Sequence, residues 1–109
     1  METINFEDFK KVEIRIGKII SAEKVESSNK LLKLQVDFST ESRQILAGIA
    51  KFYTPEQLIG KLCPFAFNLV PKMMGDVESQ GMILCADAGD GGPVLLHPDK
   101  EISPGSLVK

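Results

Sequence analysis

The stretch LLKLQVDF, Leu31 to Phe38, alternates apolar and polar residues along most of its length. A repeat of two residues is typical of a β-strand with one buried face, because successive side chains of an extended chain point to opposite sides. The polar face carries Lys33, Gln35 and Asp37. The face predicted to join a hydrophobic core consists of Leu32, Leu34, Val36 and Phe38.

The segments on either side of this strand extend it into a sheet. The polar residues 39–42 form a turn signal, and RQILAGIA, residues 43–50, follows as a second apolar run, so we expect a β-hairpin. Upstream, residues 12–22 also alternate, and Val12, Ile14 and Ile16 are predicted to enter the core. Gly17 interrupts that pattern and indicates a bulge or a sharp coil, which a small closed barrel needs in order to bend one long strand.

Two short helices are predicted from capping residues. Asn5 is a capping residue with Asp8 three positions later, which indicates a helix of one or two turns near the start. Thr54, followed by proline and then Gln57, predicts a helix over residues 55–59, and Gly60 is a typical C-terminal glycine.

The remaining segments complete an all-β pattern. Residues 61–69 and 81–87 are predicted as strands, and the loop between them is part of NLVPKMMGDVESQGM, Asn68 to Met82. We therefore expect an all-β fold with short helices, a five-stranded barrel, in a single domain over residues 1–109. Residues 1–86 would form the barrel and its N-terminal helix. Residues 87–109 would form a C-terminal extension, whose apolar residues have little core of their own to join and favour a homodimer interface.

The net charge of -2 conceals an uneven distribution. Residues 10–72 hold eleven Lys and Arg against six Asp and Glu, whereas residues 1–9 and 73–109 are acidic. A basic surface favours contact with phosphates, although a solvated surface with chance asymmetry explains the same pattern. The chain has no apolar run of membrane-spanning length and its acidic start does not resemble a signal peptide, so we expect a cytoplasmic protein with no membrane partner.

Motifs for catalysis or metal binding are missing. His97 is the only histidine, and Cys63 and Cys85 lie too far apart for a metal-binding or redox pair motif. No serine lies in a nucleophile elbow, and GDGG, residues 89–92, lacks the lysine of a phosphate-binding loop. We expect a binding module without catalytic residues, metal or cofactor.

Four segments together resemble a known family. FEDFKKVEIRIGKI, RQILAGIAKFYTPEQLIGK, NLVPKMMGDVESQGM and the terminal PGSLVK are similar to the tRNA-binding domain at the C-terminus of methionyl-tRNA synthetases and in stand-alone structure-specific tRNA-binding proteins. The resemblance implies an oligonucleotide-binding (OB) barrel with C-terminal elements that form a homodimer. The loop VESSNKL, Val25 to Leu31, departs from the family, whose pattern begins with His-Pro. Only Lys30 and Leu31 match there.

The resemblance also implies an RNA-binding site. Asn68 and Ser79 match family positions at the two ends of the loop, where an amide and a hydroxyl can hydrogen-bond a phosphate or ribose. Met82 is either an apolar contact or the first core residue of a strand, and Met73 and Met74 are interpreted as packing or dimer contacts. The complete set expected to contact RNA is Lys30, Lys33, Arg43, Asn68, Lys72, Ser79 and Met82.

The function implied is recognition of folded tRNA by its shape and backbone, because few aromatic residues are available to stack on bases. The chain would serve as the C-terminal domain or β subunit of methionyl-tRNA synthetase, or as a free tRNA-binding dimer. Its partners would be tRNA, a second copy of itself and an aminoacyl-tRNA synthetase catalytic subunit. The alternative is a chaperone-like or scaffold protein that binds polypeptides through the same dimer.

Overall fold

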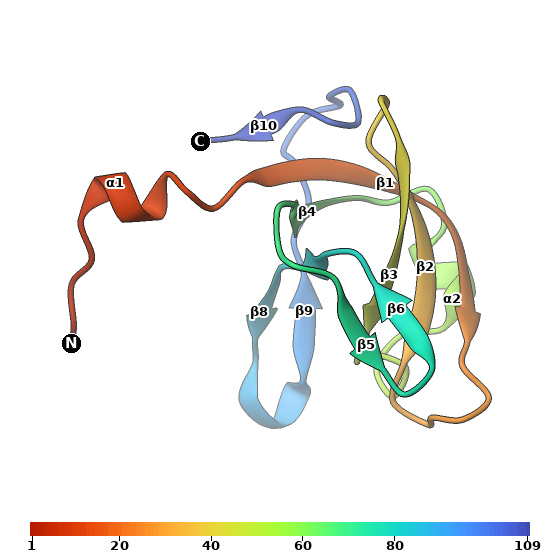
Figure 1. Cartoon of the computed structure of the whole chain (residues 1–109). Coiled ribbons are helices and arrows are strands. Elements are labelled where there is room, and N and C mark those ends of the chain that lie inside the picture. Colours follow the sequence, from red (N-terminus) through yellow and green to blue (C-terminus); the bar gives the residue numbers. More distant parts are fainter.

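A curled antiparallel sheet forms the centre of the molecule, and the computed structural model describes all 109 residues (Figure 1). The strand order is β3-β2-β1-β4-β7, with β10 attached to β1. The expected all-β fold with short helices is confirmed, and the expected five-stranded barrel is present as a curled half-barrel. The elements are α1 (Phe6–Phe9), β1 (Ile14–Lys24), β2 (Leu32–Asp37), β3 (Ser42–Ala47), α2 (Pro55–Leu58), β4 (Leu62–Ala66), β5 (Lys72–Met74), β6 (Val77–Ser79), β7 (Met82–Ile83), β8 (Cys85–Asp87), the 3-10 turn η1 (Gly89–Gly91), β9 (Pro93–Leu95) and β10 (Leu107–Val108).

The β2–β3 hairpin follows the sequence prediction. Leu34 lies opposite Ile45, and both side chains are almost completely buried. Phe38 contacts Phe65 of β4 edge to face, with ring centroids 5.5 Å apart. The central cluster consists of Ile19, Leu32, Leu34, Val36, Phe38, Ile45, Ala47, Ile49, Leu58, Cys63, Phe65 and Ile83. The alternating strand face therefore forms the core because each of its side chains meets an apolar partner from another strand.

Two details of β1 differ from the sequence prediction. Val12 is 44% exposed and lies before the strand begins at Ile14, so its assignment to the core is wrong. The pairing of β1 with β2 is irregular between Ile19 and Ser21, not at Gly17. Gly17 instead allows close packing, since a Cβ atom there would lie 2.4 Å from a methyl carbon of Val36.

The second half of the sheet is more broken than expected. The run predicted as one strand over residues 81–87 divides into β7, which pairs with β4, and β8, which pairs with β9. The loop before it contains a hairpin of its own, β5–β6, which the sequence analysis did not predict. That hairpin packs against β3 at the open edge of the sheet (Figure 1).

Both predicted helices are present. The Asn5 side chain accepts a hydrogen bond from the amide of Asp8 at 2.9 Å, and the Thr54 amide donates to the Gln57 side chain at 2.7 Å. Gly60 follows α2 with a φ of 86°, the left-handed conformation expected of a C-terminal glycine. Neither helix is long and apolar enough to cross a membrane.

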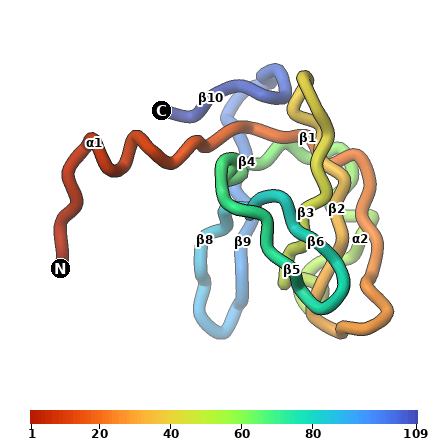
Figure 2. The backbone as a smooth tube through the Cα atoms, in the orientation of Figure 1, coloured from red at the N-terminus to blue at the C-terminus, as the bar shows by residue number.

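The C-terminal tail pairs with β1 and is therefore part of the sheet, and the backbone trace shows it running near β1 (Figure 2). Gly105 donates its amide to the carbonyl of Ile16 at 2.6 Å, and the amide of Ile16 donates to Ser106 at 2.9 Å. The Ser39 hydroxyl donates to the carbonyl of Pro104 at 2.6 Å. The backbone of residues 104–108 thus satisfies an edge of β1 that β2 does not reach, although this segment lies beyond the boundary expected at residue 86.

Candidate nucleic-acid interface

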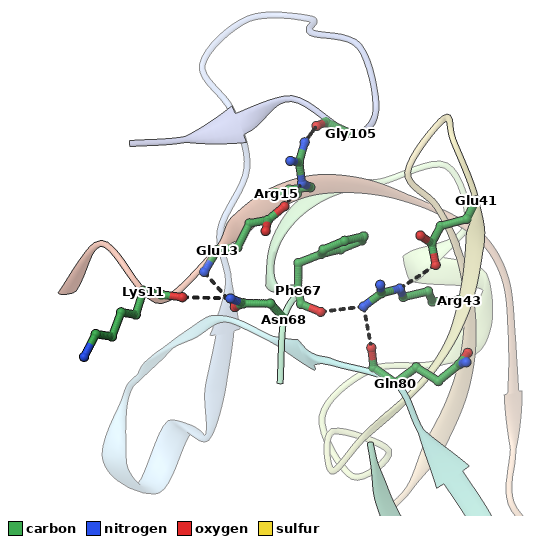
Figure 3. A network of polar contacts seen from close by, with 9 residues as sticks. All are labelled: Lys11, Glu13, Arg15, Glu41, Arg43, Phe67, Asn68, Gln80 and Gly105. Carbon is green, nitrogen blue, oxygen red and sulfur yellow. Dashed lines mark hydrogen bonds and ion pairs between the residues drawn. The ribbon is translucent and has the colours of Figure 1, made fainter. Parts of the chain in front are cut away.

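The loop that contains hairpin β5–β6 leaves the sheet after Phe67 and returns at Gln80. One nitrogen of Arg43, Nη1, donates to the backbone carbonyls of both residues, and the Gln80 contact is 3.2 Å long (Figure 3). The guanidinium lies over the Phe67 ring, with Cζ 3.6 Å from the centroid, and its Nε pairs with Glu41 at 2.8 Å. Arg43 is only 19% exposed, so this cation holds the two ends of the loop together.

The side chains of Asn68 and Ser79 also form hydrogen bonds with the protein backbone. The Asn68 amide group donates to the carbonyl of Lys11 at 2.7 Å and accepts from the amide of Glu13 at 2.8 Å (Figure 3). Ser79 is buried, and its hydroxyl accepts from Leu46 and donates to the carbonyl of Gly81, both at 3.0 Å. Ser79 therefore holds the end of the loop on β3, and Asn68 joins the start of the loop to the segment just before β1.

The hydrogen bonds between β3 and the returning loop explain how the open edge of the sheet is covered. The amide of Gln80 donates to Gln44 at 2.8 Å, and the Gln44 amide donates to the Gln80 side chain at 2.9 Å. The Gln44 side chain then reaches the carbonyl of Glu78 at 2.8 Å. Because side chains replace part of a regular ladder here, the hairpin stays attached to the sheet without becoming one of its strands.

The basic residues of the middle region fall into two groups. Five pair with an acid: Lys10, Lys11, Arg15, Lys33 and Arg43. Lys33 is the clearest case, because Glu23 lies directly opposite on β1 and their charged groups are 2.8 Å apart. The lysines of residues 10–72 without an ion pair are Lys18, Lys24, Lys30, Lys51, Lys61 and Lys72.

Three of the unpaired lysines lie at one end of the β1–β2–β3 meander. Lys24 ends β1, and Lys30 belongs to the loop that leads into β2. Ala50 donates its amide to the carbonyl of Lys30 at 3.0 Å, which brings the next residue, Lys51, to the same end. Lys24 and Lys51 are absent from the predicted site, because no sequence motif marks them and only strand pairing brings them to the same end.

Lys72 and Met82 border an apolar hollow. Met82 is 49% exposed, so it is a surface residue of β7 and not the first core residue of a strand. The hollow has a volume of about 330 Å³, and Lys72 supplies the only charged side chain in its lining. Its walls are Leu46, Leu69, Val70, Lys72, Met74, Ser79, Gly81 and Met82. The site therefore combines an unpaired cation with a flexible apolar surface.

The cysteines and the histidine form no reactive centre. Burial, followed by the nearby Cys85, raises the pKa of the Cys63 thiol from its ordinary value of 9.0 to about 12. Burial raises the pKa of Cys85 as well. The His97 ring nitrogen Nδ1 lies 3.7 Å from the Cys63 sulfur and 2.8 Å from the carbonyl of Leu62. Both thiols stay protonated at neutral pH, which makes them poor nucleophiles, and no cluster of three potential metal ligands is present.

Comparisons with known proteins identify the family of the chain. The family model described as "Putative tRNA binding domain" matches residues 14–107. The methionine–tRNA ligase of Archaeoglobus fulgidus is 53% identical over 107 residues, which are 98% of this chain and 16% of the ligase. The chain thus spans about one sixth of the length of this curated relative.

Two solved structures share the fold. A MetRS-related protein from Pyrococcus horikoshii has a TM-score of 0.94 and 40% identity, with 100% of both chains covered. The chaperone CsaA from Bacillus anthracis has a TM-score of 0.90 and 32% identity, with 99% of this chain and 100% of that chain covered. With a family match over most of its length, the chain belongs to the tRNA-binding domain family.

Proposed function

We propose that the chain binds folded tRNA through its backbone and shape, without strong sequence specificity. It would do so as the C-terminal domain or β subunit of a methionyl-tRNA synthetase, or as a stand-alone dimer. Residues 1–109 would act as one unit, and the cytoplasmic location stays a prediction. The observation that carries the proposal is the pair Lys30 and Lys72, both exposed and without an ion pair, on loops beside the sheet.

The proposed contacts differ in kind. Lys30 and Lys72 would contact phosphates directly, with Lys24 and Lys51 adding to the positive charge near Lys30. Met82 would provide apolar surface beside the phosphate contact of Lys72. Lys33 would contribute less than Lys30, because Glu23 already neutralises it. Asn68 and Ser79 would act mainly by holding the loop that presents Lys72.

The proposal favours shape over base identity because the structure offers few groups for reading bases. The Tyr53 hydroxyl accepts a hydrogen bond from the amide of Leu95 at 3.2 Å. Phe38 and Phe65 are buried, and Phe67 lies beneath Arg43. The exposed rings are Phe6 and Phe9 on the N-terminal helix and Phe52, and only Phe52 adjoins a lysine of the proposed site, Lys51. Base stacking on aromatic rings is the usual means of reading unpaired RNA, so backbone contacts are the better-supported mode.

The test is a tRNA titration over a range of salt concentrations. Because each phosphate contact releases counterions, Lys30→Ala or Lys72→Ala should each lower the slope of log affinity against log salt by roughly one unit. Two tRNAs of different identity should lose affinity about equally. Lys100→Ala is the matched control, since Lys100 is also exposed and unpaired but belongs to the acidic C-terminal third. A Lys30/Lys72 double variant with unchanged affinity and slope would reject this site.

A homodimer is the second part of the proposal. Five apolar side chains of residues 87–109 are more than 40% exposed: Val94, Leu96, Ile102, Leu107 and Val108. A hollow of about 510 Å³ lies between α1 and β10, with Phe6, Phe9 and Leu107 in its lining. Exposed apolar surface of this extent is typical of an interface.

The dimer test uses a point substitution, because truncation at Asp87 would also remove the tail that bonds to β1. Light scattering of the wild type at micromolar concentration should give twice the chain mass, and Leu107→Asp should give the monomer. Ile59→Asp, which changes an equally exposed residue next to α2, should leave the dimer intact. A monomeric wild type would contradict the proposal.

A polypeptide-binding role is the alternative, and the methionine-rich surface favours it. Met73 and Met82 are about half exposed and Val70 is 88% exposed, while Asp76 and Glu78 lie on the same hairpin. Methionine surfaces accommodate varied apolar side chains. If this role is correct, the chain should suppress aggregation of a denatured protein, and Met73→Ser, outside the hollow beside Lys72, should weaken that suppression while leaving tRNA affinity unchanged.

A further inference from the structure

We infer that Arg43 is a positioning residue for the RNA-binding loop and not a phosphate contact. The inference rests on the proposed function and assigns a different role to one of its residues. Arg43 lies near the start of edge strand β3, outside the loop of residues 68–79 that it bridges. Its action on RNA would pass through the two backbone carbonyls that it holds together.

The contacts of the guanidinium carry this inference. Nη1 serves the carbonyls of Phe67 and Gln80, the residues at which the loop leaves and rejoins the sheet. The Phe67 ring beneath the guanidinium packs in turn on Phe38 of the core, with centroids 5.0 Å apart. Because the cation is anchored to the core, the loop ends cannot separate without breaking its bonds.

The charge of Arg43 is also poorly placed to attract a phosphate. Its side chain is 19% exposed, and Glu41 supplies an opposite charge at 2.8 Å. A phosphate contact requires a cation that is free to displace the counterions held by the RNA phosphates. Lys72 meets that requirement, because it is exposed, has no ion pair and lies on the loop itself.

The geometry of the guanidinium explains why arginine suits this position. A planar guanidinium presents fixed donors that can satisfy two carbonyls while its flat face stacks on a ring. A lysine ammonium retains the charge but loses the planar stack and the fixed spacing of the donors. A positioning role therefore predicts that Arg43→Lys weakens tRNA binding, whereas a phosphate-contact role predicts unchanged binding.

Salt-dependent tRNA titration separates these roles. If Arg43 positions the loop, Arg43→Met and Arg43→Lys should both weaken tRNA binding by roughly 2- to 30-fold, the range for residues that act without touching the ligand. Wild-type affinity in Arg43→Lys would overturn the inference, because a phosphate contact needs only the positive charge that lysine keeps.

A second variant keeps the test valid if the Arg43 variants are unstable. Glu41 is 48% exposed, and Glu41→Gln removes the charge beside Arg43 while leaving both carbonyl contacts available. A phosphate-contacting Arg43 would then be less neutralised, and tRNA affinity and slope would rise. A positioning Arg43 predicts an unchanged slope, so an increase would also overturn the inference.

Hydrogen exchange without RNA tests separately whether Arg43 holds the two ends of the loop together. In Arg43→Met the amides of residues 72–80 should exchange faster than in the wild type, and unchanged exchange would contradict the inference. Arg15→Met is the matched control, because Arg15 also lies near the Phe67 ring and donates to a carbonyl, but that carbonyl belongs to Gly105. It should leave both loop exchange and tRNA affinity unchanged.

The two proposals fail in different ways. Unchanged binding in the Lys30/Lys72 double variant would reject the proposed site, whatever the Arg43 variants do. A lower slope for Lys72→Ala together with unaltered loop exchange in Arg43→Met would reject the positioning role alone.

Discussion

The N-terminal arm and the C-terminal tail both adjoin the start of β1, but the arm extends away from the sheet and only the tail is built into it (Figure 1). The C-terminal tail, residues 104–108, exchanges backbone hydrogen bonds with Ile16 and pairs with Ile14 and Arg15. The N-terminal arm, residues 1–12, contains a capped helix with no buried residue. Asn68 holds its end through the carbonyl of Lys11.

The difference shows that apolar composition alone does not attach a segment to a fold. The tail supplies backbone donors and acceptors at a position where β1 lacks a neighbouring strand. The arm supplies mainly side chains, and Phe6 remains 68% exposed because no surface of the same chain covers it. Unpaired backbone groups of a buried strand require a partner, whereas apolar side chains on an arm can remain exposed to solvent.

The largest expected effect comes from Gly105→Ala, which should detach the tail. Gly105 has a φ of 90°, and a Cβ atom there would lie 2.3 Å from the carbonyl oxygen of Phe38. Strain and overpacking together should lower the free energy of unfolding by about 2–4 kcal/mol in a denaturant titration. Gly48→Ala is the control, because a methyl group at Gly48 would have no other atom within 4 Å. Equal stability of the two variants would show that the tail is not part of the barrel.

Arg15→Met should weaken the same attachment more gently. Arg15 donates to the carbonyl of Gly105 at 2.8 Å and lies 5.4 Å from the centre of the Phe67 ring. Loss of a charged hydrogen bond and a cation–π contact should cost about 1–2 kcal/mol in the same titration. Lys18→Met, at an exposed unpaired position of β1, should change stability by less than about 0.5 kcal/mol. A loss of less than about 0.5 kcal/mol for Arg15→Met would show that Arg15 does not help to hold the tail on β1.

Asn68→Ala should release the arm with a smaller effect on the barrel. Its side chain bonds to the backbone of Lys11 in the arm and of Glu13 just after it, at an exposed position, so we expect a cost of about 0.5–1.5 kcal/mol. The amide of Glu13 should then exchange faster with solvent. Asn68→Asp keeps the acceptor for this amide but loses the donor to Lys11, and should give an intermediate result. Unchanged exchange of Glu13 in Asn68→Ala would show that other contacts hold the arm.

Removal of residues 1–10 should have the smallest effect on the monomer. The helix α1 buries no residue, and its two ion pairs are solvent-exposed. We expect the free energy of unfolding, measured at a concentration where the protein is monomeric, to change by less than about 0.5 kcal/mol. At higher concentration, where the wild type should be a dimer, the truncated chain should remain a monomer. A loss above about 2 kcal/mol in the monomer would mean that the arm packs on its own barrel.

The sequence predicted the regular parts of the fold because their causes are local. Alternation identified the buried face of β2, and the capping residues Asn5 and Thr54 located both helices. The same rule failed at Val12, since alternation continues past the point where the strand loses its neighbours. The division of residues 81–87 into two strands was not predictable, because β7 and β8 pair with different partners that are distant in sequence.

The sequence likewise predicted only part of the candidate site. The sequence identified Lys30, Lys72 and Met82, and the structure places all three at the surface. It could not show that Glu23 neutralises Lys33 or that Arg43 is used inside the protein, because both contacts depend on strand register and on the path of the loop.

By itself, the sequence determined the strand-forming segments, the helix caps, the basic middle region and the family resemblance, since each depends on residue order and local spacing. Only the tertiary structure decided which charged side chains have no ion pair and which polar side chains form hydrogen bonds with the backbone. The physical reason is that a side chain's availability depends on its neighbours in space. Folding supplied Ser79 with two backbone partners and left Lys72 exposed without an ion pair.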